Sequence, residues 1–157
     1  MDSVINKARG EADLADVRTL FHEYVAWLGV DLAFQGFDEE VANLPGKYAP
    51  SGGELFLARR DRHLVGCIGL RPFDRPGACE VKRLYVRKEA RGSGLGRALA
   101  GAAIDFAAAA GYREILLDTL PAMISAVSMY RSLGFEQIPP YWNNIIPGAM
   151  YFRKLLD

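Results

Sequence analysis

The sequence has little excess charge of either sign and no long apolar run. Its 157 residues carry 19 Lys and Arg against 19 Asp and Glu, which gives a formal net charge of +0. A general nucleic-acid binder usually carries a strongly basic face, so we expect no nucleic-acid partner. No run reaches the roughly eighteen apolar residues of a membrane span, and the first residues lack the pattern of a secretory signal. We therefore expect no membrane partner and a cytoplasmic location.

Cysteine is also scarce, and its spacing is uninformative. Cys67 and Cys79 lack the paired spacing of a zinc site, so we expect two reduced thiols and no metal. Hydrophobic content of 50% and charged content of 24% are ordinary for a globular protein. A chain of this length buries roughly 70% of its unfolded surface, so it needs no disulfide or structural metal for stability. We expect residues 1–157 to form a single domain.

The first half of the chain predicts a strand, a helix and three further strands. A short strand is expected at residues 4–7, and Asp13 resembles the N-cap of a helix that ends at Gly29. Residues 34–44 predict a shorter helix and loop. Alternating and apolar runs then predict strands at residues 54–59, 63–71 and 79–86. Their short connections indicate an antiparallel meander.

The second half alternates helices and strands. Apolar and small residues at helical spacing predict a helix from Leu95 that Gly111 stops, and residues 115–118 predict a buried strand. Pro121 is expected to open another helix, closed by Gly134, and residues 150–156 predict a last strand. The fold class is therefore α/β (α+β), with a mostly antiparallel sheet.

The segment from Val86 to Arg97 reads V-R-K-E-A-R-G-S-G-L-G-R and lies between a predicted strand and a predicted helix. Gly92, Gly94 and Gly96 let a ligand approach the backbone. The first amides of the helix lack intrahelical partners, and its dipole favours an anion there. Such a turn can hold a pyrophosphate, and four cations surround it: Arg87, Lys88, Arg91 and Arg97. The glycine spacing fits neither a dinucleotide fingerprint nor a P-loop.

Two motifs carry a resemblance to a known family. Arg91, Gly94 and Gly96 fit R-x-x-G-x-G/A, and Ala126, Tyr130 and Gly134-Phe135 fit A-x-x-x-Y-x-x-x-G-F. In these motifs the sequence resembles the GNAT superfamily of acetyl-CoA-dependent N-acetyltransferases. The segment P-Y-W-N-N at 140–144 is similar to that of uncharacterised bacterial members. The resemblance spans nearly the whole chain and implies the GNAT fold, with about six to seven strands and about four helices.

The resemblance implies direct transfer of an acetyl group from acetyl-CoA to a primary amine, without a covalent enzyme intermediate or a metal. In the family, a kink opens a V-shaped gap between the fourth and fifth strands. Tyr130 would protonate the departing thiolate, since a phenol keeps its proton at neutral pH. The implied cosubstrate-binding residues are Leu84, Tyr85 and Val86 for the pantetheine arm and acetyl carbonyl, and Arg91, Gly92, Ser93, Gly94, Leu95, Gly96 and Arg97 for the pyrophosphate.

Glu80 is the leading candidate for the base that deprotonates the amine. Several family members place a glutamate at this position, and strand alternation predicts that Glu80 shares a face with Lys82, Leu84 and Val86. Two alternatives remain open: Glu80 forms an ion pair with Lys82 or a neighbouring strand, or ordered water carries the proton. Met123 departs from the family, because many members have an asparagine there that contacts the cofactor.

The acceptor is not identified by the sequence. In the family, the first helices and last strands build its pocket, and here they offer Tyr24, Trp27, Phe34, Gln35, Phe37, Tyr141, Trp142, Asn143 and Asn144. These residues suit a small amine or a peptide end. His22 and His63 are expected to be structural or surface residues. Two other functions stay open, an acyltransferase with a longer acyl donor and a non-catalytic acyl-CoA sensor, and a homodimer is a further possibility.

Overall fold

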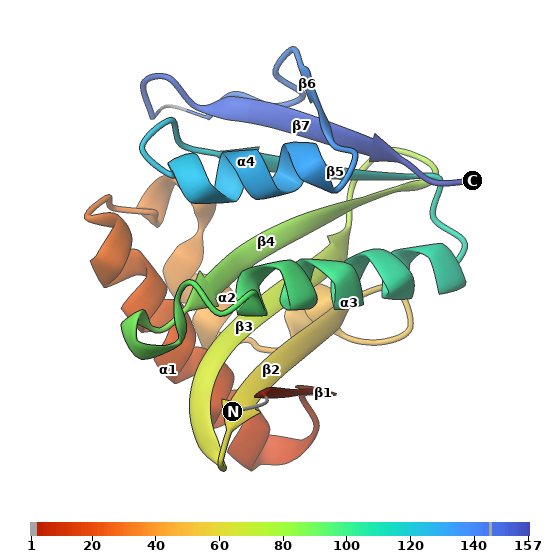
Figure 1. Cartoon of the computed structure of the whole chain (residues 1–157). Coiled ribbons are helices and arrows are strands. Elements are labelled where there is room, and N and C mark those ends of the chain that lie inside the picture. The colour runs from red at the N-terminus through yellow and green to blue at the C-terminus, as the bar shows by residue number, and fades with distance from the viewer. Residues whose placement is uncertain (1–2, 145) are drawn as a thin grey trace.

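The structure, a computed structural model, describes residues 3–144 and 146–157, apart from the side chain of Phe34 (Figure 1). Within this range the strands are β1 (Ser3–Lys7), β2 (Glu54–Arg60), β3 (His63–Pro72), β4 (Ala78–Val86), β5 (Glu114–Thr119), β6 (Glu136–Ile138) and β7 (Met150–Leu155). The α-helices there are α1 (Gly10–Leu28), α2 (Phe37–Ala42), α3 (Leu95–Ala109) and α4 (Ile124–Ser132). None of these helices is long and apolar enough to cross a membrane.

The strands form one sheet in the order β1-β2-β3-β4-β5-β7-β6. Neighbouring strands pair antiparallel, except for the parallel pair β4 and β5. The predicted mixed, mostly antiparallel sheet is therefore confirmed. β6 was not predicted from the sequence, because three residues without a buried face carry no readable alternation.

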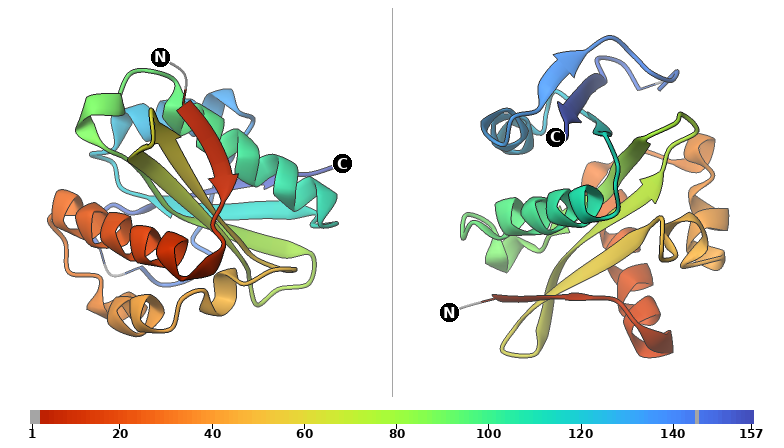
Figure 2. Two further views of the ribbon diagram at one scale, coloured as in Figure 1. Left: turned by 90° about the horizontal axis from the view of Figure 1, so that it is seen from below. Right: turned by 90° about the vertical axis from the view of Figure 1, so that its right-hand side faces the viewer.

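Helices cover both faces of the sheet, which explains the continuous apolar runs in the central strands (Figure 2). Leu55 and Leu57 of β2 pack in the cluster that contains α1 and α2, while Phe56 and Ala58 pack in the cluster that contains α3. The side of α3 that meets the sheet is rich in alanine, so its backbone can approach closely; its buried residues are Leu95, Leu99, Ala100, Ala103 and Ala107.

Two predicted helix starts are wrong. α1 begins at Gly10, and Asp13 lies inside its first turns, where its carboxylate accepts a hydrogen bond from the backbone N–H of Arg9 at 2.8 Å. The Asp13 carboxylate thus bonds the backbone at the N-terminus of α1, but from a position inside the helix and not from the N-cap. α4 begins at Ile124, because the non-helical Met123 precedes it and Pro121 belongs to the turn before.

A bulge in β4 changes which side chains face each side of the sheet. Arg83 has a φ of 61°, and the register shifts between Gly69↔Lys82 and Cys67↔Tyr85. Two residues of β4 therefore oppose one of β3, as in a β-bulge. Arg83 contacts Glu40 of α2, whereas Leu84 and Val86 pack in the cluster that contains α3. The expectation that Glu80 and Lys82 share a face with Leu84 and Val86 is wrong, because alternation does not continue through a bulge.

The parallel pair β4–β5 is short. It joins only Ala78, Cys79 and Glu80 to Glu114, Ile115 and Leu116. β4 continues to Val86 and β5 to Thr119, so both strands run on beyond their last pair. Side chains from α4 and from the residues before β7 line the space where they separate. This opening positions the site described below.

Candidate active site

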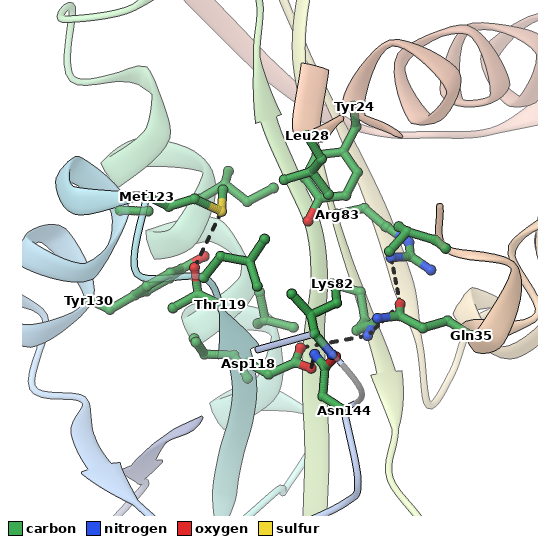
Figure 3. A pocket seen from close by; sticks show the side chains of 17 residues that line it. Tyr24, Leu28, Gln35, Lys82, Arg83, Asp118, Thr119, Met123, Tyr130 and Asn144 are labelled. Atoms are coloured by element: carbon green, nitrogen blue, oxygen red, sulfur yellow. Dashed lines mark hydrogen bonds and ion pairs between the residues drawn. The ribbon is translucent and has the colours of Figure 1, made fainter. Parts of the chain in front are cut away.

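Two neighbouring cavities lie where β4 and β5 separate. The α3 groove has a volume of about 430 Å³, and its lining includes Trp27, Tyr85, Arg91, Gly94, Gly96 and Ser125. The Lys82 cavity has a volume of about 60 Å³, and its lining includes Tyr24, Gln35, Lys82, Asp118, Tyr130 and Asn144 (Figure 3). Leu84, Met123 and Ala126 line both, so a molecule in the groove can reach the cavity.

The turn before α3 supplies a run of free backbone donors. Within the part of the chain that the structure describes, the N–H groups from Gly92 to Arg97 donate no hydrogen bond. Gly92 and Gly94 have φ of 78° and 84°, a region that costs other residues about 1–2 kcal/mol. A Cβ at either position would meet nothing within 4 Å. Free donors at a helix N-terminus, beside open space, suit an anion such as a pyrophosphate.

Arg91 adds positive charge at the same groove. Its guanidinium lies 4.8 Å from the ring centre of Trp27 and 5.9 Å from that of Tyr85. Its Nε donates a hydrogen bond to the carbonyl oxygen of Val86 at 2.9 Å. Stacking and this hydrogen bond hold the Arg91 side chain at the groove. A guanidinium has five N–H groups, so Arg91 keeps donors for a ligand.

Tyr130 enters the Lys82 cavity from α4 (Figure 3). The side chain is buried and packs edge to face on Phe135, with ring centres 5.4 Å apart. Among the described residues, none forms a hydrogen bond with its hydroxyl group. Burial raises the pKa of Tyr130, and the charge of Asp118 adds to the effect. The phenol therefore holds its proton at neutral pH and can donate it to a group that enters the cavity.

Lys82 and Asp118 face each other across the opening. Each lies two residues beyond the last β4–β5 pair, Glu80↔Leu116, and their side chains are 5% and 8% exposed. Lys82 Nζ lies 3.8 Å from Asp118 Oδ1 and 3.4 Å from Gln35 Oε1. Burial lowers the pKa of Lys82, and the charge of Asp118 opposes this effect. The cavity thus has a buried cation on one wall and a buried anion on the other.

The segment before β7 orients Asp118. Its Oδ2 accepts hydrogen bonds from Trp142 Nε1 and Asn144 Nδ2, each at 3.0 Å. The sequence proposed Trp142 and Asn144 as acceptor residues but did not single out Asp118. An aspartate near the end of a buried strand was the available signal, and only the tertiary structure shows that it meets Lys82.

A family model provides the deciding comparison. The model described as the acetyltransferase (GNAT) family matches residues 18–135. The chain belongs to this family. A relative in Schizosaccharomyces pombe, an uncharacterized N-acetyltransferase, is 44% identical over 143 residues, which cover 90% of this chain and 87% of that protein. The chain is therefore an acetyltransferase, as its motifs predicted.

Solved structures agree on the fold. An acetyltransferase of the GNAT family from Staphylococcus aureus Mu50 superposes with a TM-score of 0.81 at 21% identity, covering 99% of this chain and 100% of that one. The PaiA N-acetyltransferase of Thermoplasma acidophilum, solved in complex with coenzyme A, superposes with a TM-score of 0.75 at 19% identity, covering 99% of each chain. The predicted GNAT fold is confirmed.

The acetyltransferase places the predicted donor-side residues together. Leu84, Tyr85, Val86, Arg91, Gly92, Gly94, Leu95 and Gly96 line the α3 groove. Ser93 donates its hydroxyl hydrogen to Ala90 O at 2.5 Å, which closes the turn. Arg97 lies in the first turn of α3 and bonds Ser132 of α4. Of the surrounding cations, Arg87 is paired with Glu23, with Nη2 and Oε2 2.6 Å apart.

Glu80 lies outside the lining of both cavities. Its Oε1 accepts hydrogen bonds from Arg71 Nε and Nη2 at 3.2 and 3.1 Å, and its Oε2 accepts one from the Tyr141 hydroxyl at 2.7 Å. The side chain is only 2% exposed. This is the ion pair with a neighbouring strand that the sequence left open, because Arg71 belongs to β3. The role of Glu80 as a base stays a prediction.

The remaining acceptor-side candidates divide. Tyr24, Gln35 and Asn144 line the Lys82 cavity, whereas Trp27 lines the α3 groove. Phe37 is buried in the core, where the ring of His22 packs against it, and the side chain of Phe34 lies outside the described residues. Among the residues that the structure describes, no His, Cys, Asp and Glu side chains gather in a group that could hold a metal ion.

Proposed function

We propose that this acetyltransferase moves an acetyl group from acetyl-CoA to a primary amine of a small molecule or a peptide, within a ternary complex. The observation that supports this most is the run of free N–H donors from Gly92 to Arg97 beside a groove that adjoins the cavity containing Tyr130. Donor and acceptor could then approach from opposite sides of the opening and meet near Leu84, without a covalent enzyme intermediate.

The α3 groove has the features that coenzyme A requires. The donors from Gly92 to Arg97, with Arg91 above them, would hold the pyrophosphate. Leu84, Tyr85 and Val86 would lie along the pantetheine arm, on the strand edge that β5 leaves unpaired. The coenzyme A bound to the solved relative from Thermoplasma acidophilum supports the same choice of ligand.

Tyr130 would act as the acid. The amine nitrogen attacks the thioester carbonyl carbon, a C–N bond forms, and the C–S bond breaks. An acceptor that arrives as an ammonium ion gives one proton to water before the attack, and the nitrogen gives a second proton to water after it. The sulfur leaves as a thiolate that takes the phenolic proton of Tyr130, which is later restored from solvent. The pKa of Tyr130 is raised by burial, so the hydroxyl is protonated when the thiolate forms, and its place in the cavity lining puts it near the opening. The products are the acetylated amine and free coenzyme A.

The contacts of Glu80 favour water as the first proton carrier. Both of its carboxylate oxygens already accept hydrogen bonds, from Arg71 and Tyr141. A substituted Glu80→Gln enzyme that keeps the wild-type pH dependence of kcat/KM would support transfer through water. A pH dependence that loses its acid limb in this variant would instead establish Glu80 as the base.

Two measurements test the proposed function. Calorimetry with acetyl-CoA should show binding, and a screen of amino acids, small amines, aminoglycosides and peptide N-termini should release free thiol. Failure to bind any coenzyme A derivative would refute the assignment of the groove. Binding without thiol release across the screen would instead favour an acyl-CoA sensor. Thiol release only with longer acyl-CoA donors would show that the enzyme transfers a longer acyl group than acetyl.

A further inference from the structure

The Lys82 ammonium is the least satisfied buried charge at the opening. It is more than nine-tenths buried, and its one hydrogen bond among the described residues, to Gln35 Oε1, is long at 3.4 Å. Gln35 Oε1 already accepts a shorter bond of 2.9 Å from Arg83 Nη1. An ammonium group has three donors, and a buried charge needs strong partners. Lys82 therefore has bonding capacity for a ligand in its cavity.

Arg83, the neighbouring cation in the same lining, already has its charge paired with a carboxylate, although two of its five N–H donors remain unused among the described residues. Its Nε and Nη2 bond the two carboxylate oxygens of Glu40 at 3.1 Å each, and its Nη1 bonds Gln35. The bulge at Arg83 turns this side chain toward α2, so its charge is neutralised within the protein. Of the two cations, Lys82 has the weaker partners, since its nearest carboxylate oxygen lies 3.8 Å away and that of Arg83 lies at 3.1 Å, so Lys82 gains more from an anionic group in the cavity.

Asp118 supplies the opposite charge on the facing wall. Its Oδ2 is used by Trp142 and Asn144, while its Oδ1 faces Lys82 at 3.8 Å, beyond hydrogen-bonding distance. The pair is therefore close enough for attraction and open enough for a ligand's own charges to replace it. A dianion would be repelled by Asp118, and an amine without an anionic group would leave Lys82 without a stronger partner.

We infer that the Lys82 cavity binds the acceptor as a zwitterion, with a carboxylate at Lys82 and the reacting amino group held at Asp118. This rests on the proposed acetyl transfer. A cavity of about 60 Å³ has room for only a few non-hydrogen atoms, since about 10–15 Å³ admits one water. An α-amino acid head has that size. The acceptor class is thus free amino acids rather than polyamines or peptide ends, whose carboxylates are absent or distant.

Charge complementarity also gives the buried Lys82 a role. Burial lowers its pKa, so an arriving carboxylate would stabilise the charged form that the protein alone supports poorly. Asp118 from β5, Gln35 from the turn before α2, Glu80 and Arg83 from β4 and Arg71 from β3 set the field around it. The centre of the Trp142 ring lies 5.8 Å from Lys82 Nζ.

The test compares matched acceptors. Thiol release from acetyl-CoA is measured with the twenty L-amino acids and with their carboxamides, which keep the amino group and lose the charge. We expect at least one amino acid to exceed its amide in kcat/KM by about 10- to 100-fold, the range for a bond to a charged group. Lys82→Met should reduce this ratio to about 3-fold or less, because the rate for the acid should fall much more than the rate for the amide. Lys47→Met, at an exposed lysine outside both cavities, should keep the ratio.

Each outcome decides the inference. Equal use of acids and amides by the wild type would overturn it, whether or not the variant folds, and so would equal losses for both acceptors in Lys82→Met. Acetylation confined to amines without a carboxylate would overturn it and leave the proposed function standing. Acetyl-CoA binding with no amine acetylated would overturn the proposed function itself. Lys82→Arg, which keeps the charge, should retain part of the preference for acids.

Discussion

The α3 groove and the Lys82 cavity meet at Leu84, Met123 and Ala126, but they are built from different parts of the chain. The groove is lined mainly by two continuous segments, residues 84–96 and 122–129, and its polar donors are the backbone N–H groups before α3 together with Arg91. The cavity is formed by side chains from α1, β4, β5, α4 and the segment before β7. Backbone donors depend little on side-chain identity, so they suit a ligand that is the same in every enzyme of the family. Side chains from several elements can be substituted one at a time, so they suit a ligand that differs between enzymes. The difference fits a constant donor and an acceptor particular to each enzyme.

The largest effect is expected at the junction of the two sites. Tyr130→Phe should lower kcat by about 100-fold or more and leave the affinity for acetyl-CoA nearly unchanged, because the ring remains and only the acid is lost. Stopped-flow or steady-state thiol release and calorimetry measure the two quantities. Tyr112→Phe is the matched control, since this tyrosine bonds Gly52 O and lies outside both cavities. Equal kcat values for Tyr130→Phe and the wild type would show that Tyr130 is not the general acid.

The next effect should be confined to the groove. Gly94→Ala forces a Cβ into a turn with φ of 84°, which costs about 1–2 kcal/mol. If the turn relaxes in the free protein and binding restores its conformation, the affinity for acetyl-CoA should fall by about 5- to 30-fold. Gly101→Ala, in the middle of α3 with nothing within 4 Å of the new Cβ, should leave affinity unchanged and stabilise the helix by about 0.5–1 kcal/mol. Calorimetry that finds both variants alike would contradict the role of the turn.

Two tryptophans should separate the sites. Trp142→Phe removes the hydrogen bond to Asp118 and should raise the acceptor KM by about 2- to 10-fold, with acetyl-CoA affinity unchanged. Trp27→Ala removes the ring under Arg91 and should weaken acetyl-CoA by a few-fold, with the acceptor KM unchanged. Steady-state kinetics in both substrates tests this. If each variant affected both substrates equally, the two cavities would form one inseparable site.

The smallest effect lies outside the opening. Arg87 lowers the pKa of Glu23 through their hydrogen bonds, against the opposing effect of burial. A carboxyl with a lowered pKa in the folded state adds stability above its unfolded pKa and loses it as the pH falls. Glu23→Gln should therefore cost less than about 1 kcal/mol at pH 7, since the pair is partly exposed, and nothing near pH 2. Urea unfolding at both pH values checks this, and a variant equally destabilised at both would assign the loss to packing instead.

Elements with a strong local signal were predicted well. Gly29, with φ of 69°, ends α1 as expected, and the glycine turn before α3 was recognised because its residues are contiguous. The start of α4 was missed because Pro121 suggests a helix start wherever the chain turns. Glu80 was chosen from its position along β4, and the sequence could not show that Arg71 and Tyr141 occupy both of its oxygens.

By itself, the sequence determined the sheet-and-helix pattern and the position of the glycine turn before α3, because each depends on residues close together in the chain, while the roles of this turn and of Tyr130 stay predictions. Only the tertiary structure decided the rest. The bulge at Arg83 reverses the faces of β4, the early end of the β4–β5 pairing opens the sheet, and Lys82 then meets Asp118 across the gap. These features arise from backbone conformation and long-range packing, which strand alternation does not encode.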